Sequence, residues 1–235
     1  FFVLGTYKMR KLSPIEKYQQ ERRMQMLAKT DFYGKEVLEI GIFKTENLKI
    51  ASAKKAKALY GAAVSDKDFQ AVKQKMNGME VDLAKIKKDY LPFPDQCFDL
   101  VFSDTFFQYV TDDSLFEKLL KEACRTAEED LVLIEITEEK TVKAENITAR
   151  KPDEYIKICE KEDFKLKKIE FINAQISLNL AKFLRQNFKA KNPDSDLPEL
   201  IQKVSLPVTK VLDSFFPANR HLTKMVFERK PQEYF

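Results

Sequence analysis

The sequence predicts an α/β fold, with a doubly wound and mostly parallel sheet, helices on both faces and a helical insertion late in the chain. Short runs rich in β-branched and aliphatic residues alternate with longer amphipathic segments, which is the pattern of strand–helix–strand units. The run 131–134 is apolar at every position, as expected of a parallel strand covered on both faces. A hydrophobic share of 44% over 235 residues is enough to form a sizeable core.

The N-terminal helix has the clearest start signal in the chain. Ser13 can cap it, Pro14 suits its first position, and Glu16 completes a capping box. We therefore expect a helix from this point to about Ala28, followed by a strand at 36–40.

The middle of the chain continues the alternation. Apolar runs predict further strands at 58–64, 79–82, 98–103 and 130–136. Capping residues and apolar residues at helical spacing predict helices at 47–53, 65–76 and 112–127.

The last third changes character. A short helix at 152–160 precedes a strand at 164–171, and a final strand is expected at 222–228. Between these two strands lies a helical stretch of about fifty residues, at about 173–221. A helical insertion at this place suggests a lid or a docking surface.

The positive charge is concentrated at the N-terminus. Residues 1–30 hold seven Lys and Arg against two Glu, and the whole chain has a net charge of +4. We therefore expect a basic helical arm at 1–34 and a single α/β domain at 35–235. The arm is either a docking segment for acidic protein, anionic lipid or nucleic acid, or the solvated face of a helix. Since the given sequence does not begin with Met, a cleaved targeting peptide is one explanation, and we expect an intracellular protein with the mitochondrion as a candidate compartment.

Composition argues against several kinds of site. Cys97, Cys124 and Cys159 lack CxxC spacing, which argues against a disulfide framework or a zinc site and for free thiols. His221 is the only histidine, so neither a histidine-based metal site nor a Ser-His-Asp array is expected. No run of 18 apolar residues exists, so no membrane span is expected.

The turn after the first strand departs from the usual nucleotide-binding pattern. Gly41 ends the strand as expected, but Phe43 and Thr45 occupy the two alternate positions that follow. Glycine is used there because it has no Cβ and tolerates positive φ, so that the backbone can approach a ligand closely. The turn therefore predicts a nucleotide-binding fold whose ligand site is altered.

Three segments carry a family resemblance. They are 91–101 (LPFPDQCFDLV), 37–41 (VLEIG) and 60–65 (YGAAVS). They resemble, in turn, the entry to strand four, strand one and the end of strand two of the class I S-adenosylmethionine-dependent methyltransferases, in the methyltransferase type 11-like branch. The resemblance covers about residues 35–137 and implies the family's seven-stranded Rossmann-like methyltransferase sheet, with S-adenosylmethionine as the cofactor.

The resemblance also implies where the cofactor would bind. Glu39 matches the acidic residue that helps hold the cofactor's amino group, Gly41 matches the first glycine, and Asp82 is the candidate for the acidic residue near the adenine. Phe43 stands where the methionine part of the cofactor should lie, and its ring is expected to occupy that space. Ala63 replaces the carboxylate that accepts hydrogen bonds from the ribose hydroxyls, a loss of about 1–3 kcal/mol per bond.

The residues after the fourth strand are open to two interpretations. The aromatic run 106–109 either forms a pocket for a methyl acceptor or fills the crevice of the cofactor, and Phe43 favours filling. Ser103 and Asp104 at the same strand end either face a substrate or cap a helix.

Together these features favour a methyltransferase-like protein that is catalytically inactive and acts as a structural or assembly subunit of a larger intracellular complex. It would have protein partners, no metal, no catalytic residue, and either S-adenosylmethionine or no cofactor at all. The alternative is an active methyltransferase with an atypical cofactor loop, because methyl transfer relies largely on proximity and alignment. A nucleic-acid-binding role for the arm fits less well, since aromatic and basic residues are not interleaved there.

Overall fold

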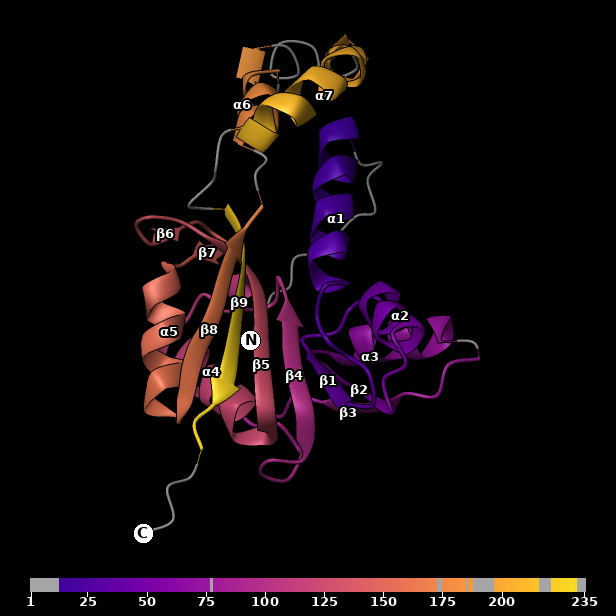
Figure 1. The fold of residues 1–235 in the computed structure, drawn as a ribbon, viewed down its shortest axis with the longest axis vertical. Helices are drawn as coiled ribbons and strands as arrows, with labels where there is room; N and C mark the ends of the chain where they lie inside the picture. The colour runs from indigo at the N-terminus through magenta and orange to yellow at the C-terminus, as the bar shows by residue number, and fades with distance from the viewer. Residues whose placement is uncertain are drawn as a thin grey trace.

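The computed structural model describes residues 13–76, 78–172, 175–184, 186–187, 197–215 and 221–231. A seven-stranded sheet in the order β3-β2-β1-β4-β5-β9-β8 forms its centre, as Figure 1 shows. The strands of this sheet are β1 (Glu36–Ile40), β2 (Ala58–Ala63), β3 (Asp82–Lys85), β4 (Phe98–Asp104), β5 (Ala127–Thr137), β8 (Phe164–Phe171) and β9 (His221–Arg229). The helices are α1 (Pro14–Leu27), α2 (Glu46–Ala53), α3 (Asp66–Lys75), α4 (Asp113–Thr126), α5 (Pro152–Lys161), α6 (Gln175–Leu184) and α7 (Leu197–Phe215).

The sheet is parallel from β3 to β5, and β9 runs antiparallel to both β5 and β8. Ile40 of β1 is in register with Ala62 of β2 and with Ser103 of β4. The residues that follow β1, β2 and β4 therefore meet at one edge of the sheet, where ligands bind in open α/β folds. This architecture confirms the predicted fold class.

Two apolar clusters, one on each face, hold the layers together. The buried side chain of Leu38 joins Leu119 of α4 and Tyr155 of α5 in one cluster. The other cluster includes Leu48 of α2 and Val72 of α3. Because successive residues of a strand point to opposite faces, the central strands β1, β4 and β5 contribute to both clusters, which is why each contains consecutive apolar residues.

Helix α1 begins as its capping residues predict. The Ser13 side chain accepts a hydrogen bond from the backbone of Glu16, and the Glu16 side chain accepts one from the backbone of Ser13. At its other end, the buried Lys224 of β9 donates hydrogen bonds to the carbonyl oxygen of Met26 at 3.1 Å and to Thr30 Oγ1 at 2.7 Å. Burial lowers the pKa of Lys224 to about 8. The helix of the predicted basic arm thus packs against the α/β domain, and residues 1–12 of that arm lie outside the described residues.

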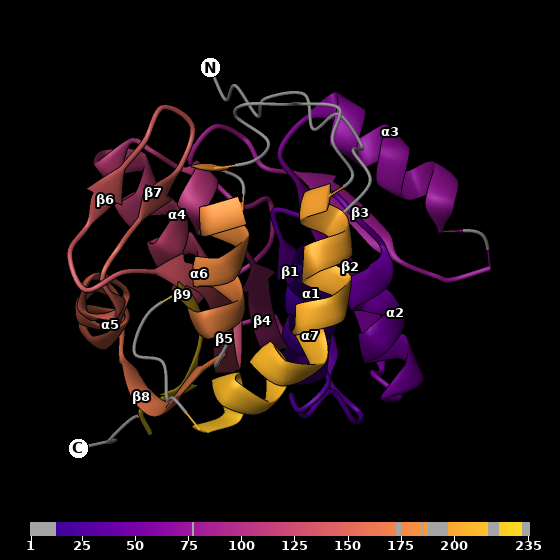
Figure 2. The ribbon, with the colours of Figure 1, turned by 90° about the horizontal axis from the view of Figure 1, so that it is seen from above.

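The predicted insertion contains α6 and α7, which lie with α1 beyond the carboxyl ends of the parallel strands (Figure 1, and from above in Figure 2). The parts of this predicted insertion at 173–174, 185, 188–196 and 216–220 lie outside the described residues.

Two details of the chain differ from the sequence prediction. The third strand was placed at 79–82, but it begins only at Asp82, because the backbone N–H of Met79 still bonds the carbonyl of Met76 in the turn that ends α3. A short hairpin of β6 (Val142–Lys143) and β7 (Thr148–Ala149) was not predicted, since each strand has only two residues.

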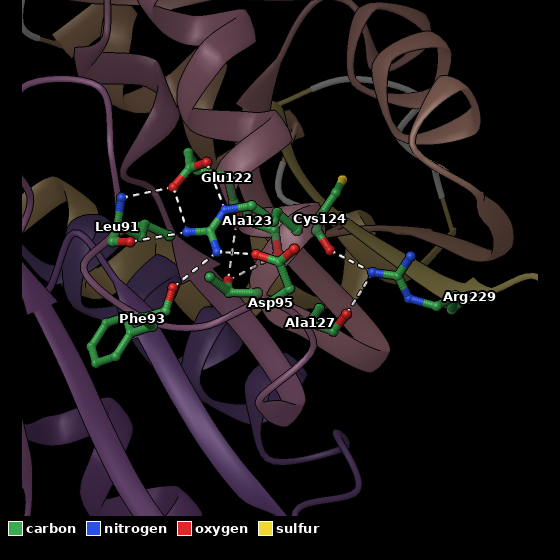
Figure 3. A network of polar contacts seen from close by, with 10 residues as sticks. Leu91, Phe93, Asp95, Glu122, Ala123, Cys124, Ala127 and Arg229 are labelled. Carbon is green, nitrogen blue, oxygen red and sulfur yellow. Dashed lines mark hydrogen bonds and ion pairs between the residues drawn. The ribbon is translucent and has the colours of Figure 1, made fainter.

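The family-like segment before β4 is folded around one arginine. Arg125 of α4 donates to the carbonyl oxygens of Leu91 at 3.0 Å and Phe93 at 2.9 Å, and it forms an ion pair with Asp95 at 2.6 Å. Glu122 pairs with the same guanidinium and also accepts the backbone N–H of Leu91 (Figure 3). The segment therefore has a structural role at the carboxyl-terminal end of α4, away from the carboxyl ends of the parallel strands.

Candidate functional site

Two buried carboxyl groups lie side by side at the carboxyl edge of the sheet. Glu39 comes from the end of β1 and Asp104 from the end of β4. The side-chain amide of Asn47, in the first turn of α2, donates to Glu39 Oε1 at 2.7 Å and to Asp104 Oδ2 at 2.9 Å. One amide group therefore bridges both acids.

Helix α1 supplies the positive charge at this place. Arg23 Nε lies 3.4 Å from Asp104 Oδ2, and its Nη1 donates to Thr105 Oγ1 at 3.4 Å. Thr105 has φ of 59°, a left-handed conformation that is unusual for a β-branched residue. We call Glu39, Asn47, Asp104 and Arg23 the acidic cradle.

The two carboxyl groups of the acidic cradle are only partly stabilised by the other residues of the cradle. Burial raises the pKa of Glu39 well above its usual value, against the opposing effect of the Asn47 hydrogen bond. Burial likewise raises the pKa of Asp104, opposed first by the charge of Arg23. Glu39 Oε2 and Asp104 Oδ1 are both buried, and neither accepts a hydrogen bond from any residue that the structure describes. Since unpaired buried acceptors are costly, the cradle suits a further cationic donor such as an ammonium group.

Gly41, at the start of the crossover to α2, is covered by an aromatic ring. It has φ of +74°, and a Cβ built on it would lie 2.2 Å from Cγ and Cδ2 of the buried Phe106. Only glycine fits both this conformation and this contact. The open face of Gly41 thus accommodates a side chain from the segment after β4.

Buried polar groups on two sides fix the segment that carries this ring, which includes the 3-10 turn η1 (Phe107–Tyr109). Glu135 of β5 accepts hydrogen bonds from the backbone N–H groups of Phe107 at 3.1 Å and Gln108 at 3.2 Å. Arg150, fully buried, donates to the carbonyl oxygens of Phe107 at 3.3 Å and Val110 at 2.8 Å. Burial raises the pKa of Glu135 to about 8, although these N–H groups and a serine hydroxyl stabilise its charge. The ring over Gly41 is therefore held from both sides.

The sequence-predicted residues are only partly brought together. Glu39 and Gly41 lie at the strand end beside the cradle, and Ala63 is buried at the end of β2. Phe43 is half-buried and belongs to neither apolar cluster, and Lys44 Nζ lies 5.4 Å from the centroid of its ring. The aromatic ring that covers Gly41 is therefore that of Phe106, a member of the run 106–109 that was expected to fill the crevice, and not that of Phe43.

Asp82 lies away from the cradle. It is exposed at the first residue of β3 and in register with Tyr60 in the middle of β2. Since β3 runs parallel to β2, its carboxyl end is at Lys85 instead. The shift of the third strand thus removes the reason for placing Asp82 beside an adenine.

Sequence reasoning missed two members of the acidic cradle and left the role of Asp104 open. Arg23 and Asn47 come from helices before and after β1, and only the packing of α1 and α2 brings them to the strand ends. The one available signal for Asn47 was a polar residue in the first turn of the helix after the glycine turn, at a position that is buried in the structure.

Comparison with known proteins agrees with this fold. A family model described as a methyltransferase domain matches residues 38–134. The solved structure of the cyclase SpnF is 13% identical, with a TM-score of 0.63, and the alignment covers 92% of this chain and 82% of that one. A putative methyltransferase in complex with the Trm112 methyltransferase activator of Haloferax volcanii is 16% identical, with a TM-score of 0.62 and coverage of 93% and 94%. A putative sarcosine dimethylglycine methyltransferase from Galdieria sulphuraria is 12% identical, with a TM-score of 0.60 and coverage of 92% and 86%.

The strand order and the glycine turn define an α/β protein with a methyltransferase-type sheet. The match of a methyltransferase domain over residues 38–134, together with this fold, bears out the resemblance of that segment to the class I S-adenosylmethionine-dependent methyltransferase family. Among curated proteins, none matches the sequence.

The described residues contain neither a cluster of metal ligands nor a helix able to span a membrane. They contain no group of three or more His, Cys, Asp or Glu side chains placed to hold a metal ion. In the same part of the chain, every helix is too short or too polar to cross a membrane.

Proposed function

We propose that this chain is a methyltransferase-like protein without methyltransferase activity, which acts as a structural or assembly subunit of a larger intracellular complex. The observation that carries the proposal is the ring of Phe106 packed on Gly41, because the backbone of this turn is where the family brings its cofactor close. The buried contacts of Glu135 and Arg150 keep the ring in place.

The ribose end of the crevice supports the same proposal. Ala63 offers no acceptor at the end of β2, and the nearby acids are already engaged. Asp66 forms an ion pair with Lys85 at 2.6 Å, and Asp68 accepts a hydrogen bond from Ser65 at 2.5 Å. A ribose bound here would lose two hydrogen bonds to a carboxylate, each worth about 1–3 kcal/mol.

The fold by itself does not decide the activity. One of the similar solved structures is described as a cyclase, and another is described in complex with an activator protein. Sites on a shared fold differ in chemistry, so the argument rests on the residues at this crevice.

The second candidate function is an active S-adenosylmethionine-dependent methyltransferase with an atypical cofactor loop. The observation that favours it is that Glu39 Oε2 and Asp104 Oδ1 accept no hydrogen bond within the described part of the chain, so that they suit the amino group of the cofactor. In that case the acidic cradle would hold and orient the methionine end, and the bound cofactor would supply the methyl group.

Isothermal titration of the purified chain with S-adenosylmethionine separates the two candidates. We expect no binding at micromolar concentrations, and a micromolar Kd would overturn the inactive proposal. Phe106→Ala tests whether the ring blocks the crevice, the double variant Phe43→Gly with Ala63→Asp tests the two positions named from the sequence, and Phe93→Ala serves as the control. Recovery of binding in Phe106→Ala alone would assign the block to that ring. Sedimentation of the native protein at the size of a single chain would overturn the subunit proposal.

A further inference from the structure

The acidic cradle contains one cation, Arg23, and this residue comes from outside the sheet. It lies on α1, which stands over the carboxyl ends of the strands (Figure 1, and from above in Figure 2). The side chains of residues 19–25 are exposed or half-buried, whereas Tyr18 and Met26 on either side are buried. Arg23 therefore reaches the two acids from a part of α1 that is only partly covered by the rest of the protein.

The contact of Arg23 with the cradle is long. Its Nε lies 3.4 Å from Asp104 Oδ2, and its Nη1 lies 3.4 Å from Thr105 Oγ1, whereas hydrogen bonds between charged groups are normally about 2.7–2.9 Å. Arg23 Nε is buried and has no hydrogen-bond partner among the described residues. The guanidinium of Arg125, by contrast, pairs with Asp95 at 2.6 Å. Arg23 thus supplies positive charge to the cradle but leaves hydrogen-bonding capacity unused.

The acids have unused capacity as well. Glu39 and Asp104 are more than nine-tenths buried, and Glu39 Oε2 and Asp104 Oδ1 accept no hydrogen bond in the described part of the chain. A single nitrogen of Asn47 bonds Glu39 at 2.7 Å and Asp104 at 2.9 Å, so both carboxyl groups lie within reach of one small ligand. An ammonium group offers three donors on a compact charge, while a guanidinium is a larger planar group. The two open oxygens therefore suit an ammonium better than they suit Arg23.

The other charged groups near the cradle do not take the place of Arg23. Lys44 is half-buried, and its Nζ lies 5.4 Å from the centroid of the Phe43 ring. Glu46, in the first turn of α2, is exposed. Within the described residues, neither forms an ion pair with the two acids. The charge that directly opposes the acids is therefore that of Arg23.

We propose that Arg23 is an internal occupant of the acidic cradle, and that a ligand with a primary ammonium group displaces it. The guanidinium then moves from the acids to solvent, beside the exposed residues of α1, and the ammonium donates to Glu39 Oε2 and Asp104 Oδ1. Such a ligand shifts the equilibrium because it binds the open cradle more tightly than the closed one. The exchange involves the acids and not the ring of Phe106, so it is independent of whether the crevice takes S-adenosylmethionine.

A titration of the full chain with methylammonium chloride at pH 8, followed by NMR, tests the exchange. The side-chain amide of Asn47 reports on the acids, and the Nε–H of Arg23 reports on the guanidinium. We expect both signals to change along one binding curve, with a Kd in the millimolar range. Tetramethylammonium chloride at the same ionic strength is the control, since it carries the same charge without an N–H donor, and it should leave both signals unchanged.

Substitutions of Arg23 test the direction of the effect. Arg23→Met should bind methylammonium about tenfold more tightly, because a competing like charge is removed from beside the acids. A residue that only helps to form the site would weaken binding when it is removed. Arg23→Gln keeps a polar side chain and should show the same gain, which provides a second variant. Arg22→Met, at the exposed neighbouring arginine of α1, is the matched control and should bind as the unchanged protein does.

Four outcomes would overturn the proposal. They are no response of the Asn47 amide to methylammonium, a response there without any change at Arg23 Nε–H, equal responses to the two cations, and equal or weaker binding by both Arg23 variants. The second outcome would mean that the ligand binds beside Arg23, and the third would assign the response to ionic strength. Because the probe is methylammonium, each outcome is separate from the titration with S-adenosylmethionine that tests the proposed function.

Discussion

The Asn47→Asp substitution would remove the bridge between the two buried acids while preserving the shape of the side chain. In the structure, the amide of Asn47 donates at 2.7 Å to Glu39 and at 2.9 Å to Asp104. Aspartate removes both donors and adds a third carboxyl group beside a single arginine. Each hydrogen bond lost to a charged buried group costs about 1.5–3 kcal/mol. We therefore expect the free energy of unfolding to fall by about 3–5 kcal/mol near neutral or mildly basic pH.

The loss should depend on pH. Burial already raises the pKa values of Glu39 and Asp104, and a third acid would raise them further. A carboxyl group with a raised pKa in the folded state gives its full stability below its unfolded pKa, and that stability is lost as pH rises through the folded pKa. At about pH 5 a protonated carboxyl can donate to its neighbour, so the loss should be smaller there than at about pH 8.

Urea unfolding at both pH values measures this difference. Asn146→Asp, an Asn-to-Asp change at an exposed position between β6 and β7, is the matched control and should change stability by no more than about 0.5 kcal/mol. An equal loss at both pH values, or a loss below about 1 kcal/mol at pH 8, would refute the shared amide as the support of the two acids.

Three further substitutions test other side chains that hold the fold by several hydrogen bonds. Glu135→Gln should flatten the pH dependence of stability. In the unchanged protein, the raised pKa of Glu135, about 8, contributes stability that is fully present at acid pH and is lost as pH rises through that value. The midpoints of urea unfolding across this pH range measure the difference. Lys224→Met should cost about 1–3 kcal/mol by removing the hydrogen bonds to the carbonyl of Met26 and the hydroxyl of Thr30, and hydrogen exchange should show faster opening of α1 than of β5. Arg125→Lys should lower the Tm although the charge is kept, because lysine cannot donate to two carbonyls and two carboxylates at once; an unchanged Tm would contradict that role.

The fold was largely predictable because strands covered on both faces are apolar at every position. The runs at β4 and β5 and the capping signals at Ser13 and Ser65 are local, and the structure confirms them. The predicted position of the third strand was wrong because an apolar residue, Met79, belongs to the turn after α3 and not to the sheet. Short runs of this kind carry too little periodicity to fix a boundary.

The site was less predictable because its contacts join distant parts of the chain. Glu39 and Gly41 follow from the pattern of one strand and its turn, and both lie at the predicted edge. The contact of Phe106 with Gly41 and that of Arg23 with Asp104 depend on how separate segments pack. The sequence pattern indicated that an aromatic ring would interfere with the turn, but only the packing distinguishes which ring lies there.

The position of β9 has a consequence for synthesis. This strand is the last element of the sheet to be translated, yet it lies between β5 and β8. Arg229, at the end of β9, donates to the carbonyl oxygens of Cys124 and Ala127, both at 2.6 Å (Figure 3). These hydrogen bonds connect β9 to the end of α4 as well. A ribosome-bound chain that stops before residue 221 can pair β1 to β5 but leaves β8 without its neighbour in the sheet. Completion of the sheet must therefore await the synthesis of residues 221–229, and until then the edges of β5 and β8 that pair with β9 stay open to other chains.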